Sequence, residues 1–63
     1  KYYTMKGFIE VTTYEGKIKR LINLNNIVEV IDWYPVSIKI INNDAFVIEE
    51  SYEQIKQLIK EAQ

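Results

Sequence analysis

The sequence predicts an α+β fold, in which a small five-stranded antiparallel sheet or half-open barrel packs against one C-terminal helix. Between residues 6 and 49 lie five short apolar segments, and most of them alternate apolar and polar positions as a half-buried strand does. Turn-forming residues separate these segments. After residue 51 the apolar spacing changes to that of an amphipathic helix. Because hairpins twist and one helix covers only one side, the sheet is expected to curl.

Length and composition limit how such a fold can be stabilised. The 63 residues correspond to one domain, so residues 1–63 are predicted to form a single β5α unit. Met5 is a candidate native start, and residues 1–5 are expected to be disordered or additional to the native chain. A domain of this size buries only about 60% of its unfolded surface, and small domains often depend on disulfides, metals or association. With no Cys and no His, a disulfide is excluded and a zinc site is disfavoured, which leaves association.

The net charge and the short apolar runs limit the classes of partner that the protein is expected to bind. The formal net charge of −1 provides no overall field that would attract nucleic acid. The apolar runs are far shorter than the roughly 20 residues that span a bilayer, and the N-terminal residues do not resemble a secretory leader. The sequence therefore predicts a cytoplasmic protein without membrane contact.

The first predicted strand covers residues 6–13. Ile9 and Val11 alternate with polar neighbours, the period of two that is typical of a half-buried strand. Gly16 follows where the chain must reverse, and glycine adopts the positive φ angle of a tight turn without steric cost. These features predict a hairpin into the next strand.

The second predicted strand, residues 17–24, interrupts this alternation. Arg20 falls on the same parity as apolar residues of the strand. We favour a β-bulge near residues 19–21, which would shift the register; alternatively, Arg20 lies on a partly open face of the sheet. The asparagine-rich residues 23–26 then predict a turn.

The third predicted strand, residues 27–33, is apolar on both parities apart from Glu29. Strands buried on both faces have this composition and usually occupy the centre of a sheet. We therefore expect this strand to be central and covered on both sides. Pro35 ends it, because proline has no N–H to donate to a ladder.

The fourth and fifth predicted strands, residues 36–41 and 45–49, form a second hairpin. Asn42 and Asn43 lie between them and suit the positive φ angles of a two-residue type I′ turn. Alternate side chains of the two strands are expected to face the core, namely Val36, Ile38, Ile40, Phe46 and Ile48.

A helix is predicted to begin after Ser51. Ser51 and Gln54 form a capping box, in which each side chain bonds the backbone N–H of the other residue. The apolar residues that follow recur at helical spacing and predict one buried stripe that packs on the sheet: Ile55, Leu58, Ile59 and Ala62.

The sequence offers little for catalysis. There is no His, no Cys and no glycine-rich phosphate loop. Glu49 and Glu50 are adjacent and could form a carboxylate dyad or a site for a hard cation such as Mg²⁺ or Ca²⁺. The favoured interpretation is structural, because consecutive strand residues point to opposite faces. We therefore predict that the protein is not an enzyme and has no cofactor.

The segment Trp33, Tyr34 and Pro35 is the candidate protein-interaction site. Large aromatic residues with a polar tip are enriched at interface hot spots, and here they lie beside a rigid proline at a strand end. Alternatively, Trp33 folds back as a lid over the end of the barrel. The two interpretations are compatible if the lid is also an oligomer contact.

A second candidate surface lies around the first hairpin. Tyr14, Lys17, Lys19 and Arg20 cluster there, with Tyr2 and Tyr3 nearby in sequence. Basic residues interleaved with aromatics can hold phosphates and stack bases. The favoured interpretation is an edge strand whose lysines prevent edge-to-edge pairing.

With the strands placed, the chain from Phe8 onward resembles the small flagellar FlbD family. The segments that carry the resemblance are FIEVTTYEG, INLNNIVEVIDW and VSIKIINNDAFVIEESYEQIKQLI. Gly16 matches the turn glycine of the family, Asn23 matches the asparagine of its LNxDLI segment, and Ser51 lies at its ES step. Asn43 stands where the family has a hairpin glycine. The resemblance implies a non-enzymatic accessory protein linked to flagellar assembly or motor function.

Two other classes share this organisation. Residues 27–59 have the strand–hairpin–helix rhythm of the first half of a LytTR DNA-binding domain, which is longer and more basic. Small phage proteins that bind and block a host factor are also similar. We predict a non-enzymatic protein-interaction or assembly module of a bacterial, flagellar or phage system that self-associates. The alternative is a small RNA- or DNA-binding regulatory protein that uses the basic hairpin.

Overall fold

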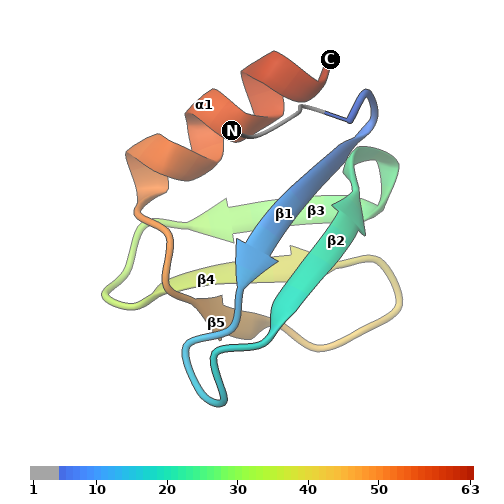
Figure 1. The fold of residues 1–63 in the computed structure, drawn as a ribbon. Coiled ribbons are helices and arrows are strands. Elements are labelled where there is room, and N and C mark those ends of the chain that lie inside the picture. The colour runs from blue at the N-terminus through green and yellow to red at the C-terminus, as the bar shows by residue number, and fades with distance from the viewer. Residues whose placement is uncertain (1–4) are drawn as a thin grey trace.

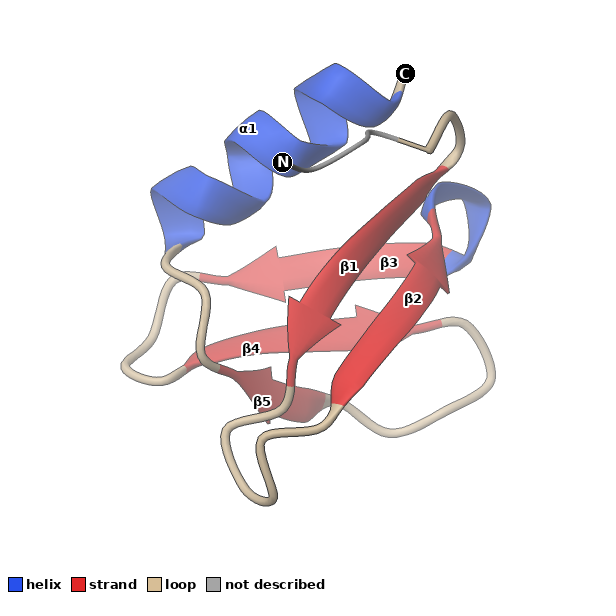
Figure 2. Ribbon diagram, in the orientation of Figure 1, coloured by secondary structure: helices blue, strands red, loops and turns tan. Residues whose placement is uncertain are grey.

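The computed structural model describes residues 5–63 and contains five strands and one α-helix in that part of the chain (Figures 1 and 2). The predicted character of residues 1–4 lies outside the described residues. Met5 is described, and its carbonyl accepts a hydrogen bond of 3.0 Å from the Phe8 amide. In chain order the elements are β1 (Phe8–Thr12), β2 (Lys19–Asn23), a 3-10 turn η1 (Leu24–Asn26), β3 (Ile27–Ile31), β4 (Val36–Ile40), β5 (Phe46–Ile48) and α1 (Tyr52–Ala62).

The strands form two antiparallel sheets, one with the order β1-β2 and one with the order β3-β4-β5. An isolated bridge between Thr13 and Ile48 joins them, and the Glu49 amide donates to the Thr12 carbonyl at 2.8 Å. The predicted α+β class, with five antiparallel strands and one C-terminal helix, is confirmed. The strands are divided between two small sheets rather than forming one sheet, and the sheets do not close into a barrel (Figure 2).

The hairpin of β1 and β2 is confirmed, but the bulge predicted in its second strand is wrong. The register runs without a shift from Phe8 opposite Asn23 to Thr12 opposite Lys19. Arg20 is exposed, as the alternative interpretation required, and its guanidinium lies 4.2 Å from the centroid of the Phe46 ring. Arg20 lies opposite the buried Val11, on the inward parity of Ile22, but β2 pairs only with β1 in the described part of the chain. Its other edge is therefore unpaired there, and residues 19–21 are all exposed.

The prediction that the third strand is central and covered on both sides is also wrong. β3 bonds only to β4 within residues 5–63, and the Val28 side chain is 57% exposed. The bulge of this fold lies here, where the register with β4 shifts between Ile27 and Glu29. An extra residue inverts the alternation, so an edge strand can be apolar on both parities. The central strand is β4.

The hairpin of β4 and β5 has a longer connection than predicted. β4 ends at Ile40 and β5 begins at Phe46, so a two-residue type I′ turn is excluded. Asn42 has the predicted positive φ angle, 63°, whereas Asn43 is not among the described residues with positive φ and donates its amide to the Ile40 carbonyl at 3.1 Å. This five-residue loop lies at the opposite end of β4 from the loop that carries Trp33 (Figure 1).

The helix begins as predicted. The Gln54 amide donates to Ser51 Oγ at 3.1 Å, and the Ser51 amide donates to Gln54 Oε1 at 2.8 Å, which completes the capping box. Its apolar stripe packs on the sheets, with Ile55 and Ala62 buried and two further residues half-buried. At the other end of the helix, the Ala62 carbonyl accepts a bond of 2.7 Å from the Gly7 amide at the start of β1.

The core lies between the helix and the two sheets. Its buried apolar side chains come from β1, β2, β4, β5 and α1: Ile9, Val11, Ile22, Val36, Ile38, Ile40, Ile48, Ile55 and Ala62. The inward positions predicted from period two are confirmed on β4, and Ile48 is buried on β5. Phe46 is half-buried instead, and the Arg20 guanidinium lies over its ring. In residues 5–63 no helix is long and apolar enough to span a bilayer.

Candidate functional site

An open groove of about 550 Å³ lies where three segments distant in sequence converge. These segments are the turn after β1, the loop between β3 and β4, and the connection from β5 to α1. Its floor is formed by the core residues Val36 and Ile48. Its aromatic side chains are Tyr14, Trp33, Tyr34 and Tyr52, with Pro35 among them. We call this surface the aromatic groove.

The loop between β3 and β4 presents the largest exposed aromatic side chains near this groove. Trp33 is 67% exposed and Tyr34 is 95% exposed. The Trp33 amide donates to the Ile31 carbonyl at 2.8 Å, so the turn begins directly at the end of β3. The Tyr34–Pro35 peptide bond is cis. The interpretation of Trp33 as a lid over the core is wrong, because a side chain that is 67% exposed does not close the core from solvent.

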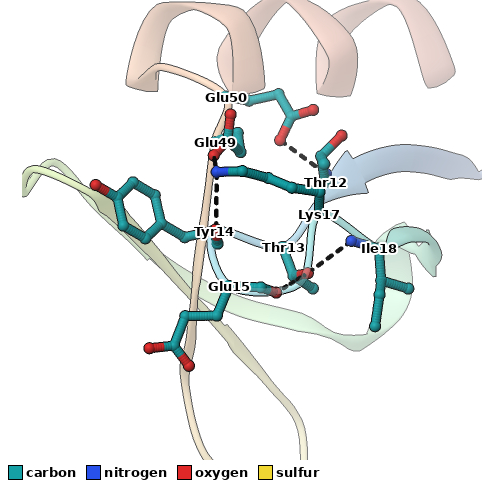
Figure 3. Close-up of polar contacts among 8 residues, drawn as sticks. All are labelled: Thr12, Thr13, Tyr14, Glu15, Lys17, Ile18, Glu49 and Glu50. Atoms are coloured by element: carbon teal, nitrogen blue, oxygen red, sulfur yellow. Dashed lines mark hydrogen bonds and ion pairs between the residues drawn. The ribbon is translucent and has the colours of Figure 1, made fainter.

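The structure divides the four residues of the predicted basic surface. Tyr14 and Lys17 line the aromatic groove, whereas Lys19 and Arg20 lie on β2 and do not. The Lys17 ammonium forms an ion pair with the Glu49 carboxylate and donates to the Tyr14 carbonyl at 3.0 Å (Figure 3). Lys17 is therefore ion-paired within the fold, while its side chain stays 63% exposed. Tyr2 and Tyr3 lie outside the described residues.

Glu49 and Glu50 also line the groove, and each carboxylate has its own partner (Figure 3). Glu49 pairs with Lys17, and Glu50 Oε1 accepts a bond of 2.9 Å from the Thr12 amide. Both residues follow the end of β5, so the predicted alternation along a strand does not apply to them. They attach the first hairpin to the start of α1. Residues 5–63 contain no group of three or more His, Cys, Asp or Glu side chains that could hold a metal ion.

The groove contains two polar residues that the sequence reasoning did not select, Asp32 and Tyr52. Asp32 precedes Trp33 and is exposed, and within residues 5–63 its side chain has neither a hydrogen bond nor an ion pair. Its position directly before Trp33 and Tyr34 in the sequence is a signal that could have assigned it to the same surface. Tyr52 is the first residue of α1 and reads in sequence as part of an amphipathic helix. The lining carries three carboxylates and one ammonium, and its formal net charge is therefore −2.

Fold and groove together define a small β-rich domain with an open, aromatic and acidic surface at one end. Comparison with known proteins finds no family model, no curated protein and no solved structure that matches the chain. The resemblance to the FlbD family therefore stays a prediction that depends on the motifs quoted above.

Proposed function

We propose that this protein is a non-enzymatic protein-interaction or assembly module that self-associates through Trp33, Tyr34 and Pro35. The observation that carries the proposal is the exposure of two adjacent large aromatic side chains, Trp33 and Tyr34, on one loop. Exposed aromatics of this kind contribute most of the binding energy at many interfaces. While exposed they add little to the stability of the fold, whereas an interface that covers them removes apolar surface from water.

The edge of β3 supports the same proposal. β3 pairs on one side only in the described residues, and its end leads directly into the aromatic loop. A strand from a second molecule can add to such an edge, and main-chain hydrogen bonds then provide adhesion. Trp33 and Tyr34 would contact the partner beside the added strand and provide selectivity.

We also propose the kind of system in which this module acts and its cellular location. The FlbD-like motifs support a bacterial assembly function, flagellar or phage-encoded, in the cytoplasm. A structural role for Glu49 and Glu50, each with a partner inside the fold, agrees with a non-enzymatic protein.

Self-association can be tested by size-exclusion chromatography with light scattering over a range of concentrations. We expect the native protein to form a dimer or larger species as concentration rises, and Trp33→Ala to stay monomeric, because hot-spot truncation costs about 2 kcal/mol or more. Ile41→Ala is the matched control, since Ile41 is 49% exposed at the opposite end of β4. A monomer for both the native protein and the Trp33→Ala variant would contradict self-association.

Nucleic-acid binding is the second candidate, supported by the exposed Lys19 and Arg20 on β2. The pairing of Lys17 with Glu49 weighs against it, because an ion-paired lysine is less able to neutralise a phosphate. We expect labelled single-stranded DNA and RNA to show no saturable binding in fluorescence anisotropy at low salt. Binding that falls steeply with added salt and is lost in a Lys19→Ala, Arg20→Ala double variant would establish this second function instead.

A further inference from the structure

We propose that the aromatic groove binds an extended, proline-rich segment of another protein, with a basic residue next to the prolines. This inference depends on the proposed function only in treating the Trp33 loop as a protein-contact surface. It adds the chemistry of the partner, which is inferred from what lines the groove.

The kind of surface favours a polyproline II segment over a strand or a helix. The groove presents aromatic rings and Pro35 above an apolar floor, and its lining includes no residue of the edge strand β3. A polyproline II segment can pack its side chains on aromatic rings while its backbone, which has no internal hydrogen bonds, stays solvated. A strand would instead require a row of free backbone groups. A helix, about 10–12 Å wide, needs a long apolar channel rather than a short open groove.

The size of the molecule is consistent with this ligand. The described residues extend over 25 × 25 × 19 Å. A polyproline II segment rises about 3.1 Å per residue, so about six to eight residues cross one face of the domain. Such a segment arrives largely preordered and loses little entropy on binding, which compensates for the shallow surface.

The charges of the groove favour a ligand that contains a basic residue. The lining carries a formal charge of −2, and Lys17 and Glu49 neutralise each other. Glu50 is bound to the Thr12 amide. Asp32, exposed and without a partner in residues 5–63, is therefore the carboxylate available to a ligand arginine or lysine. One exposed ion pair adds little affinity, but it selects the ligand's charge and direction.

The proline-rich segment is not supplied by residues 1–63. Pro35 is the single proline among them, so these residues of a second copy cannot provide it. Self-association and ligand binding would both use the Trp33 loop. A bound ligand is therefore expected to compete with self-association.

The test uses the intrinsic fluorescence of Trp33, the single tryptophan, which reports directly on the groove. The probes are three synthetic peptides: decaproline with an N-terminal arginine, decaproline with an N-terminal glutamate, and a Gly-Ser repeat of equal length with an N-terminal arginine. We expect a saturable change with the arginine–proline peptide at micromolar to millimolar concentration. The glutamate version should bind about threefold or more weakly, and the Gly-Ser version should not saturate.

Three variants assign the interaction to named groups. Tyr34→Ala, which keeps the fluorescent residue, is expected to weaken binding of the arginine–proline peptide at least tenfold. Asp32→Asn is expected to remove most of the preference for arginine over glutamate, whereas Asp44→Asn, an equal change of charge in the loop at the opposite end of β4, keeps it. Circular dichroism of each variant checks that the fold is intact.

Three results would overturn the inference: no saturable change up to millimolar peptide with the native fold intact, equal binding of the proline and Gly-Ser peptides, or equal effects of Asp32→Asn and Asp44→Asn. If Trp33-dependent oligomers form but the peptides fail, the proposed function stands and this inference falls. If the peptides bind as expected to a protein that stays monomeric, self-association falls and this inference stands.

Discussion

Replacement of Ile38 by alanine is expected to lower the free energy of unfolding by about 2–5 kcal/mol. Ile38 is 0% exposed in the centre of β4, opposite Val30 of β3 and Phe46 of β5. The truncation removes buried methyl groups and leaves a cavity between strands that cannot collapse without breaking both ladders. Small domains have little stability in reserve, so we expect much of the population to be unfolded at 25 °C.

Urea denaturation followed by circular dichroism and by Trp33 fluorescence measures this loss. Ile41→Ala is the matched control, because it removes the same atoms from a side chain exposed in the loop between β4 and β5. The control is expected to change the free energy of unfolding by less than about 0.5 kcal/mol. Similar losses for the two variants would mean that Ile38 is not at the centre of the core.

The second large effect is expected for Ile55→Ala in α1. Ile55 is 1% exposed and contributes to the apolar stripe that faces the sheets. Alanine is the better helix former, so propensity alone predicts a small gain in stability. We nevertheless expect a loss of about 2–5 kcal/mol, since the isolated helix would be marginal and its stability comes from docking.

This prediction separates helix docking from helix propensity. Gln57→Ala, on an exposed position of the same helix, is the control and is expected to change stability by less than about 0.5 kcal/mol. Helical and sheet signals should be lost together in urea, because the helix and both sheets share one core. A loss of helical signal at lower urea than the Trp33 transition would contradict this shared core.

Local chemistry explains which features could be predicted. The capping box requires only Ser51 and Gln54, three residues apart, and Gly16 adopts positive φ, 79°, where the turn needs it. The inward residues of β4 follow from the pleat of a single strand. In each case the interacting groups are close in sequence, so the preference is present before any tertiary contact forms.

The errors arose where the arrangement of strands decides the environment of a residue. An apolar pattern on both parities predicts double burial for the third strand, but a bulge after Ile27 produces the same pattern at a sheet edge. The parity of Arg20 predicts a bulge, but β2 keeps a regular register and leaves the Arg20 side chain exposed beside Phe46. Sequence periodicity reports alternation along one strand, and it does not report which strands become neighbours.

The aromatic groove also combines features that the sequence indicates with features that only the tertiary structure creates. The sequence alone marked Trp33 and Tyr34 as candidates for binding, and it determined the β5α order, the helix start and most of the inward residues. Only the tertiary structure brought Tyr14 and Tyr52 to that loop, paired Lys17 with Glu49 across 32 residues, and left Asp32 available at the rim. The physical reason is that strand pairing is a property of the whole chain: each long-range contact must offset the entropy of closing its loop, so its outcome depends on all the other contacts formed with it.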